Sequence, residues 1–523
     1  MPVNNQSNEY KDNYLNWQTV RDAVDGQFRI KAARETYLAK SSGMSEIDYK
    51  NFLKRATFFG GTSRTAEILH GHIFAKDTNQ SGEDQISDAA KEWLKNIDRA
   101  GTSLKEYMSA TTWDSMKTGY GGDLVDYVQI EPGTSLADGQ GRAYLKWYAA
   151  ESIYNLEQTV INGSRKTSLV ILREDIKQKN PKDRFDTITT EAYRVLSLDE
   201  QGYYIQEVFR KAEEGEASQN GFIPIETIEP RMNGERLNFI PFYTRPGENP
   251  EKSMLLDLAN ENINHYQLNA EYRNGLYFTS VPTPIVENMK KPYKEEELKW
   301  DEEYEEKYTD ENGEQKTRKK TRVRSKIVEK EIEVKTGGSN FLFFHSEDKD
   351  GNTTGVHVKF LEFTGAGLSE CANAINDSMS KMKMLGVKTL GTEKRGVEST
   401  ETTLIQQSAE LSVLGAFVRS TNNKITPAVR LMLKWNGIPE EEADKWSSEL
   451  PTRFNRNAIS AQILSIMHTA RQSNELPRKS WFEFLKEYGD DNDSMIVKNM
   501  DYEQFVEMLT SDDNVLSHGV SGD

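Results

Sequence analysis

MLLDLANENINHYQLNAEYRNGLY, residues 254–277, decides how the rest of the chain is divided. Apolar side chains recur in it at i, i+4, i+8, i+11 and i+15, which is the spacing of one helix face. The apolar stripe consists of Leu255, Ala259, Ile263, Tyr266 and Ala270. Gly275 and the prolines that follow at 282 and 284 end the pattern. Because the stripe is narrow and interrupted by Asn and Gln, we expect a long helix at 251–279 that packs against neighbours in an assembly.

A second long helix is predicted at 364–387. LSECANAINDSMSKMKMLG, residues 368–386, follows two glycines and keeps i, i+3 and i+4 apolar spacing. Its stripe consists of Leu368, Cys371, Ile375, Met379 and Met382. Cys371, the one cysteine of the chain, is therefore interpreted as a packed thiol and not as a nucleophile.

The segments after this helix are a loop and more helices. KTLGTEKRGVEST, residues 388–400, is rich in Gly and Thr and carries the basic residues Lys388, Lys394 and Arg395. A third long helix follows within 401–455, which we expect to be kinked or interrupted near Pro427 and to end at Gly437. We expect helices again at 456–510 and a disordered tail at 511–523.

Between the first two long helices lies a charged stretch, KWDEEYEEKYTDENGEQKTRKKTRVRSK, residues 299–326. An acidic run precedes a basic run, with Asn312 and Gly313 between them. If these two form a type I′ turn, the runs are the strands of a hairpin and their charges become cross-strand partners. The expected pairs are Glu306 with Lys319, Glu305 with Lys320, Glu303 with Arg322, and Asp301 with Arg324. Trp300, Tyr304 and Tyr308 would then share one face, opposite Ser325, Thr321 and Thr317.

A helix over 294–308 is the competing interpretation, because residues 300, 304 and 308 are also spaced by four. It would set like charges at i, i+4, which is mildly destabilising, so the hairpin is favoured. The hairpin could dock a partner or bridge subunits, its acidic strand facing a basic strand of a neighbour. The alternative is a solvated decoration without a partner.

The N-terminal half divides into three parts. Residues 1–16 are polar and predict a flexible arm. Residues 17–121 have helical periodicity. From about 122 to 245, short β-rich runs alternate with polar turns, and one of them predicts a hairpin that turns at 199–202. The predicted fold class is α+β, mainly helical.

Composition limits the function. The chain of 523 residues has a net charge of −17, which argues against an ordinary DNA-binding protein, since phosphate contacts need clustered Lys and Arg. Its seven histidines lie outside any metal-ligand motif, and its glycine clusters lack the lysine of a P-loop. We therefore expect no catalytic residues, no metal and no cofactor. With neither a signal peptide nor a membrane-spanning run, we expect a soluble protein made in a reducing cytoplasm.

The order of parts resembles that of a tailed-bacteriophage portal protein. Several stretches are similar to a portal subgroup long catalogued as a domain of unknown function, and they span roughly residues 17–440. They include LVDY at 124–127, YLKWYAAESI at 144–153, ILRED at 171–175, YRVL at 193–196, LLDLANENINHYQLNAEYRNGLYFTSVPTPIV at 255–286 and FLEFTGAGLS at 360–369. Two features depart from the subgroup: Ala143 replaces an expected proline, and the 290–335 insertion is longer and more charged.

The resemblance implies a domain plan. It assigns a wing at 17–250 and 401–455, stem helices at 251–279 and 364–387, a clip at 280–363 with the charged hairpin, a tunnel loop at 388–400 and a crown at 456–510. Such proteins form a twelve-subunit ring without catalytic activity at one capsid vertex of the virion. Double-stranded DNA passes through the ring without sequence specificity.

The partners implied are other copies of the chain, the terminase large subunit, the head-tail adaptor, and the major capsid and scaffold proteins. An acidic channel fits this function, since a basic lining would hold DNA through counterion release. Lys388, Lys394 and Arg395 would be a local contact with DNA phosphates, or ordinary surface residues. Two alternatives remain: another viral or prophage structural or scaffold protein, and an enzyme whose site has no recognisable motif.

Overall fold

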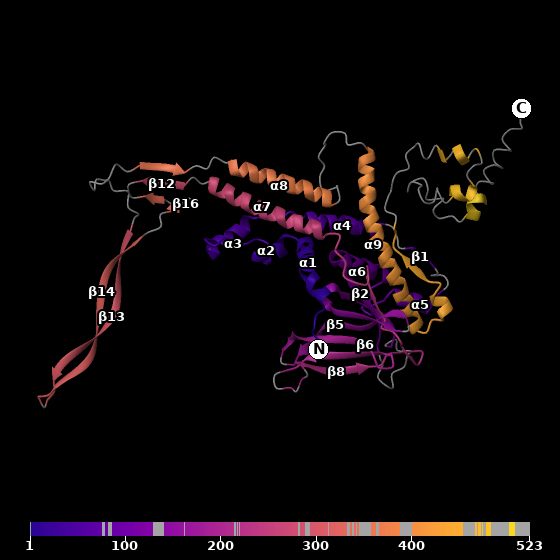
Figure 1. Ribbon diagram of the computed structural model, residues 1–523, viewed down its shortest axis with the longest axis horizontal. Helices are drawn as coiled ribbons and strands as arrows, with labels where there is room; N and C mark the ends of the chain where they lie inside the picture. Colours follow the sequence, from indigo (N-terminus) through magenta and orange to yellow (C-terminus); the bar gives the residue numbers. More distant parts are fainter. Residues whose placement is uncertain are drawn as a thin grey trace.

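The computed structural model describes most of the chain. The residues it describes are 2–75, 79–81, 86–128, 141–161, 163–181, 183–213, 216, 218, 220–280, 283–287, 293–311, 313–331, 335–336, 339–340, 342–344, 357–361, 366–386, 400–452, 466–467, 469–471, 473, 477–482 and 502–507. Helices and strands are mixed, and helical residues outnumber strand residues, as the sequence predicted. A body of helices and sheets carries two long helices, which lead to a small β unit and a projecting hairpin (Figure 1).

The N-terminal helices belong to the body (Figure 1). They are α1 (Asn8–Asp25), α2 (Gln27–Ala32), η1 (Arg34–Thr36), α3 (Glu46–Arg55), α4 (Gly61–Phe74), α5 (Asp88–Leu94) and α6 (Leu104–Thr118). Serine side chains cap α1, α3, α5 and α6 by accepting a hydrogen bond from a backbone N–H of the first turn.

The predicted flexible arm at 1–16 is wrong over most of its length. Residues 8–16 belong to α1, whose N-cap is Ser7. The backbone N–H of Ser7 donates to the carbonyl of Tyr154 at 2.9 Å, and the ring of Tyr10 is buried against Tyr154 and Trp17. Two aromatic rings seven residues apart anchor this otherwise polar segment.

Residues 121–244 are rich in strands, as predicted. β2 (Gly121–Tyr127) lies between β3 (Ala143–Ala149) and β11 (Phe242–Thr244) in one sheet. After η4 (Ala150–Ser152), an antiparallel sheet follows in chain order: β4 (Ile153–Ile161), β5 (Ser164–Asn180), β6 (Asp183–Leu198), β7 (Tyr204–Lys211) and β8 (Phe222–Ile228). β9 (Arg231–Met232) and β10 (Glu235–Arg236) form a short pair. The predicted turn between β6 and β7 is confirmed, with the Gly202 N–H donating to the Asp199 carbonyl at 2.9 Å.

The three predicted long helices are confirmed as α7 (Leu256–Ser280), α8 (Ala366–Leu385) and α9 (Thr400–Trp435). α9 continues through Pro427, so the possible interruption there does not occur. It ends before Gly437, whose φ of 87° lets the Ile438 N–H turn back to the Leu433 carbonyl at 3.1 Å. The C-terminal half of α9 is buried over β2 and β3, where Val418, Ile425 and Met432 are inaccessible to solvent.

The β unit between α7 and α8 has two parts. β12 (Thr283–Glu287) pairs with β17 (Leu342–Phe344) and β18 (His357–Leu361), and short β15 (Lys335–Thr336) pairs with β16 (Ser339–Asn340). β13 (Tyr293–Thr309) and β14 (Gln315–Glu331) form the projecting antiparallel hairpin. The hairpin is therefore confirmed over the competing helix at 294–308.

The C-terminal region is described in pieces. α10 (Glu440–Ala443) precedes β19 (Ser447–Glu449), which pairs with β1 (Asn79–Ser81). Within the predicted crown, the described residues are largely helical, and the Phe482 ring packs on Phe505 at 5.0 Å between centroids. The predicted tail at 511–523 and the predicted loop residues 388–399 lie outside the described residues.

Candidate functional site

The helix pair α7–α8 is the first part of the candidate site, and glycines set its close approach. A Cβ at Gly275 of α7 would lie 2.6 Å from Leu368 near the start of α8. A Cβ at Gly386, just after α8, would lie 3.3 Å from Leu258 near the start of α7 and 2.8 Å from Thr65 of α4. The start of each helix therefore meets the end of the other, so the pair is antiparallel and returns the chain to the body (Figure 1).

Polar side chains of α7 bind the N-terminal helices of the same chain. Gly60, the N-cap of α4, has no side chain to cap the helix, and Asn262 of α7 replaces it. The Asn262 Oδ1 accepts from the backbone N–H of Thr62 at 3.1 Å, and its Nδ2 donates to the Phe59 carbonyl at 2.8 Å. Gln267 donates to the Tyr37 carbonyl at 2.8 Å. The Asn and Gln residues that interrupt the apolar stripe thus lock α7 onto the body.

The two predicted stripes differ in burial. On α7, Leu255, Ala259, Tyr266 and Ala270 are buried and Ile263 is half-buried. On α8, Met382 is buried, whereas the rest of the stripe is half-buried, namely Leu368, Cys371, Ile375 and Met379. At the end of α8, the Met384 side chain is 81% exposed. Within one chain α7 has covered its apolar face, and α8 has not.

The hairpin register differs by one residue from the prediction. Glu305 faces Lys319, Glu303 faces Thr321, Asp301 faces Val323, and Trp300 faces Arg324. The predicted cross-strand pairs Glu306–Lys319, Glu305–Lys320, Glu303–Arg322 and Asp301–Arg324 are therefore wrong. The cause is the turn, which is longer than the predicted two-residue turn.

The turn starts at Asp310. The Gly313 N–H donates to the Asp310 carbonyl at 3.0 Å, and the Asp310 N–H donates to the Glu314 carbonyl at 2.9 Å. The Asp310 side chain also accepts from the Glu314 N–H at 2.9 Å. This is a three-residue connection with Gly313 at φ 80°, a common hairpin loop for which Asp is favoured at the first turn position. Asn312 lies outside the described residues.

The corrected register places cations beside aromatic rings. Side chains alternate between the faces of a strand, so Trp300, Tyr304 and Tyr308 share their face with the basic residues of β14 and not with Ser325, Thr321 and Thr317. The guanidinium of Arg322 lies 5.0 Å from the Tyr304 ring centroid, and that of Arg318 lies 5.1 Å from the Tyr308 centroid. These are cation–π distances.

Two glutamates on the same face each hold two cations. Glu302 accepts from Arg322 at 2.7 Å and from Arg324 at 2.5 Å, and Glu306 pairs with Arg318 at 2.6 Å and with Lys320 at 2.7 Å. On the opposite face, Lys319 lies 3.8 Å from Glu303. The predicted pairs did not include Glu302 and Arg318. A two-residue turn would set Glu302 opposite Val323 and Arg318 opposite Lys307, so neither would have an oppositely charged partner directly across the hairpin. All these pairs are exposed, so each contributes little stability and serves mainly to fix register.

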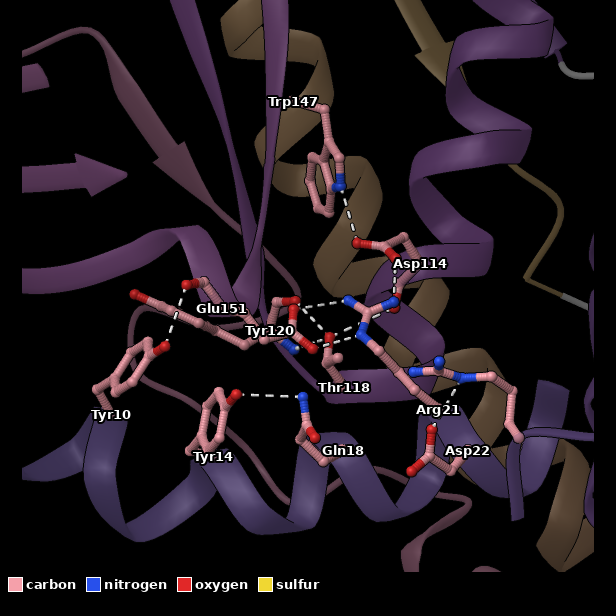
Figure 2. Close-up of polar contacts among 11 residues, drawn as sticks. Tyr10, Tyr14, Gln18, Arg21, Asp22, Asp114, Thr118, Tyr120, Trp147 and Glu151 are labelled. Atoms are coloured by element: carbon pink, nitrogen blue, oxygen red, sulfur yellow. Dashed lines mark hydrogen bonds and ion pairs between the residues drawn. The ribbon is translucent and has the colours of Figure 1, made fainter. Parts of the chain in front are cut away.

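A polar network in the body holds α1 against α6 and η4 (Figure 2). The Arg21 guanidinium donates to Glu151 at 2.8 Å and to Asp114 at 2.6 Å, and the Trp147 Nε1 donates to Asp114 at 3.0 Å. Burial alone would raise the pKa of Asp114, but the hydrogen bond and charge of Arg21 outweigh it and lower the pKa. The carboxylate stays ionised and paired, which suits a structural clamp better than acid–base catalysis.

Two further ion pairs stabilise the sheets. Arg245 and Asp123 are fully buried and joined at 2.7 Å, with Tyr107 donating to Asp123 at 2.6 Å and Trp147 beneath the guanidinium at 4.6 Å. In the five-stranded sheet, Glu174 of β5 accepts from Arg194 at 2.8 Å. Both clusters link neighbouring strands or elements of the body.

Neither a metal site nor a membrane span is found in the described part of the chain. Its His, Cys, Asp and Glu residues form no group of three or more that could hold a metal ion. None of the helices described is both long and apolar enough to cross a bilayer. The predicted channel residues Lys388, Lys394 and Arg395 lie outside the described residues, so they stay predictions.

Comparison with known families identifies one matched segment. Residues 254–436 match the model of a family described as a domain of unknown function, DUF4055. The match runs from the start of α7 to the end of α9, so it covers the helix pair, the β unit and the third long helix. No curated protein matches the chain.

Proposed function

We propose that this chain is the subunit of a portal ring at one vertex of a tailed-phage capsid. About twelve copies would enclose a channel through which double-stranded DNA is packaged and later ejected. The ring is non-enzymatic, and the motor activity belongs to the terminase that docks on it. α7 and α8 are the stem, the β unit is the clip, and the body is the wing.

The observation that carries the proposal is the antiparallel pair α7–α8 with a β unit at its far end (Figure 1). A channel wall needs rigid elements of matched length from each subunit, and the paired helices have 25 and 20 residues. At 1.5 Å per residue each is about 30 to 38 Å long. The β unit is held away from the body, where partners can reach it.

Two other observations support the proposal. The segment matched by the DUF4055 model contains all the elements assigned to stem and clip, although its description gives no function. The net charge of −17 suits a channel through which DNA must slide, since a basic lining would bind the phosphates and slow the DNA. On this proposal the clip binds the terminase large subunit and later the head-tail adaptor, and the wing contacts capsid and scaffold proteins.

The test is the native mass of the purified full-length chain together with negative-stain images. Twelve copies of the 59.7 kDa chain would give a particle of about 720 kDa with an axial hole. Assembly should be repeated with scaffold protein present, in case the ring forms only on it. Open filaments or a closed particle without an axial hole would contradict the portal ring and favour another structural or scaffold protein. A monomer under both conditions would reopen the possibility of an enzyme.

A further inference from the structure

The hairpin β13–β14 separates its charges by strand. β13 carries eight carboxylates and three lysines, a net charge of −5, and β14 carries eight basic residues and two carboxylates, a net charge of +6. The pairing within the hairpin uses one edge of each strand. The opposite edges of these strands therefore have opposite charge.

Those outer edges are long and open. Among the described strands, β13 and β14 pair with each other and with no third strand. Each has 17 residues, so each outer edge presents about 55 Å of backbone with N–H and C=O groups that can accept another strand. A two-stranded hairpin is only marginally stable in water, and more strands are needed for independent stability.

Apolar side chains are also exposed along the hairpin. Leu298 and Trp300 of β13 are 52% and 47% exposed, and Val323 and Ile327 of β14 are 68% and 64% exposed. Leu298 and Trp300 lie on one face of the hairpin and Val323 and Ile327 on the other, all at nearly the same height, because Trp300 faces Arg324 and Leu298 faces Lys326. A neighbouring strand on either side would cover part of this apolar surface.

We propose that the outer edge of β13 pairs with the outer edge of β14 from the next copy of this chain, so that the hairpins form one continuous antiparallel sheet. Rotation about a ring axis keeps all hairpins pointing the same way, so β13 of one copy runs opposite to β14 of the next. Every acidic strand then lies between two basic strands, one from its own chain and one from a neighbour. This inference rests on the proposed ring for closure, because a head-to-tail contact without a closing rotation would instead give a filament.

A second copy explains the charge distribution better than nucleic acid does. A phosphate-binding ribbon would need the basic strand but would be weakened by an acidic strand of equal length beside it. The separation of acidic residues on β13 from basic residues on β14 favours pairing between these two strands, since opposite charges directly across a ladder are favourable and like charges are unfavourable. It also disfavours pairing between two β13 edges or between two β14 edges, because either would set like charges together.

The experiment uses cross-linking between full-length chains with Cys371 replaced by Ser. One chain carries Leu298→Cys on β13 and the other carries Val328→Cys on β14, two positions on the same face at similar height. The two are co-expressed and treated with a bifunctional thiol reagent whose span is about 5 Å, because identical positions of adjacent copies lie two strand spacings, about 9.6 Å, apart and are not to be joined. Cross-linked dimers are expected in the mixture but not from either chain alone, because only a head-to-tail contact brings the two positions together.

A charge-swapped hairpin is the matched control. Its β13 carries Asp301→Lys, Glu302→Lys, Glu303→Lys, Glu305→Lys and Glu306→Lys, which changes the net charge of the strand from −5 to +5. Its β14 carries Arg318→Glu, Lys319→Glu, Lys320→Glu, Arg322→Glu and Arg324→Glu, which changes the net charge from +6 to −4. Internal pairing is kept, because the reversed residues face one another or lie next to one another across the hairpin. The yield of cross-linked dimers should be the same for two swapped chains as for two unswapped chains. Mixed pairs should cross-link about tenfold less at low salt, and the difference should shrink at high salt.

The outcomes separate this inference from the proposed ring. Rings of the expected mass without hairpin cross-links, or with equal cross-linking of mixed and matched pairs, would overturn the inference and leave the ring standing. Charge-selective cross-links in open oligomers would support the strand pairing and overturn the ring. Absence of both would overturn both. Binding of a fluorescent DNA duplex that is lost in the swapped hairpin, without cross-links, would assign β14 to phosphate contact instead.

Discussion

The Glu174 cluster allows a quantitative prediction. Glu174 of β5 accepts from Arg194 of β6 at 2.8 Å and from Lys146 of β3 at 2.7 Å, and the Tyr148 hydroxyl also donates to it. The carboxylate therefore joins the five-stranded sheet to the three-stranded one. We expect Glu174→Gln to remove the charge that both cations share, while keeping the size of the side chain.

The magnitude follows from the pKa of the group. Burial alone would raise the pKa of Glu174, but the charges and hydrogen bonds of Arg194 and Lys146 outweigh it and lower the pKa from 4.5 to about 2. At about 1.4 kcal/mol for each pKa unit, the ionised form contributes about 3 kcal/mol to folding. Because the pKa is lowered in the folded state, this contribution is complete above 4.5 and is lost as the pH falls toward 2.

The assay is guanidinium unfolding followed by tryptophan fluorescence at about pH 7 and about pH 3. Glu174→Gln should lower the free energy of unfolding by about 3 kcal/mol at the higher pH and by clearly less at the lower pH. Glu226→Gln, at an exposed position of β8, is the control and should change little at either pH. Equal destabilisation by Glu174→Gln at both pH values would refute the electrostatic reasoning, since a packing defect does not depend on the ionisation of Glu174.

Three other substitutions probe the body and the helix pair. Arg245→Ala leaves the carboxylate of Asp123 buried without its cation, and we expect a loss of about 3 to 5 kcal/mol in the free energy of unfolding, whereas a loss below about 1 kcal/mol would contradict the buried pair. Asn262→Ala removes the acceptor for the first turn of α4. We expect it to lower the free energy of unfolding by about 1 kcal/mol and to speed hydrogen exchange of the backbone amides in that turn. Unchanged exchange would count against this cap. Gly275→Val should push α7 from α8 by contact with Leu368 and lower the melting temperature more than Gly275→Ala does, since the small methyl of Ala meets only the movable end of Leu368.

Periodicity predicted the elements well where one residue spacing dominates. The three long helices and the hairpin follow from apolar or charge patterns that extend over many residues, so an error of a few residues at an end does not change the element. The N-terminal arm was mispredicted because α1 is polar overall and is held by only a few buried side chains. Tyr10 and Trp17 are spaced by seven residues, and Ser7 precedes them as a cap, which together were the available signal.

The hairpin register depends on a local choice that charge pattern alone does not decide. A two-residue turn and a three-residue turn both bring the acidic run against the basic run and differ by one residue in register. Asp310 favours the longer turn because it accepts two hydrogen bonds there. Its side chain accepts from the Glu314 N–H, and its backbone carbonyl accepts from the Gly313 N–H. An Asp at the first turn position could have given this register from sequence.

The partners of α7 could not be read from its own sequence either. Asn262 and Gln267 lie more than 200 residues from Thr62 and Tyr37, and a polar residue on a helix gives no indication of which distant backbone group it will bind. From sequence, the interruption of the apolar stripe by Asn and Gln predicts only a helix that packs against neighbours in an assembly. In the structure these side chains bind the body of the same chain, so they fix the direction in which α7 leaves it.

This division of contacts has a consequence for the proposed ring. α7 has buried four of its five stripe residues within the chain, whereas four of the five on α8 remain half-exposed, followed by the exposed Met384. The apolar surface left for a neighbour in the stem therefore lies mainly on α8. Substitutions on α8 such as Ile375→Ser are expected to weaken assembly and to leave the unfolding midpoint of the monomer nearly unchanged. Tyr266→Ser on α7 should instead lower the unfolding midpoint of the single chain. Native mass and unfolding midpoints measured on both variants would decide, and the reverse pattern would place α8 inside the subunit and α7 at the interface.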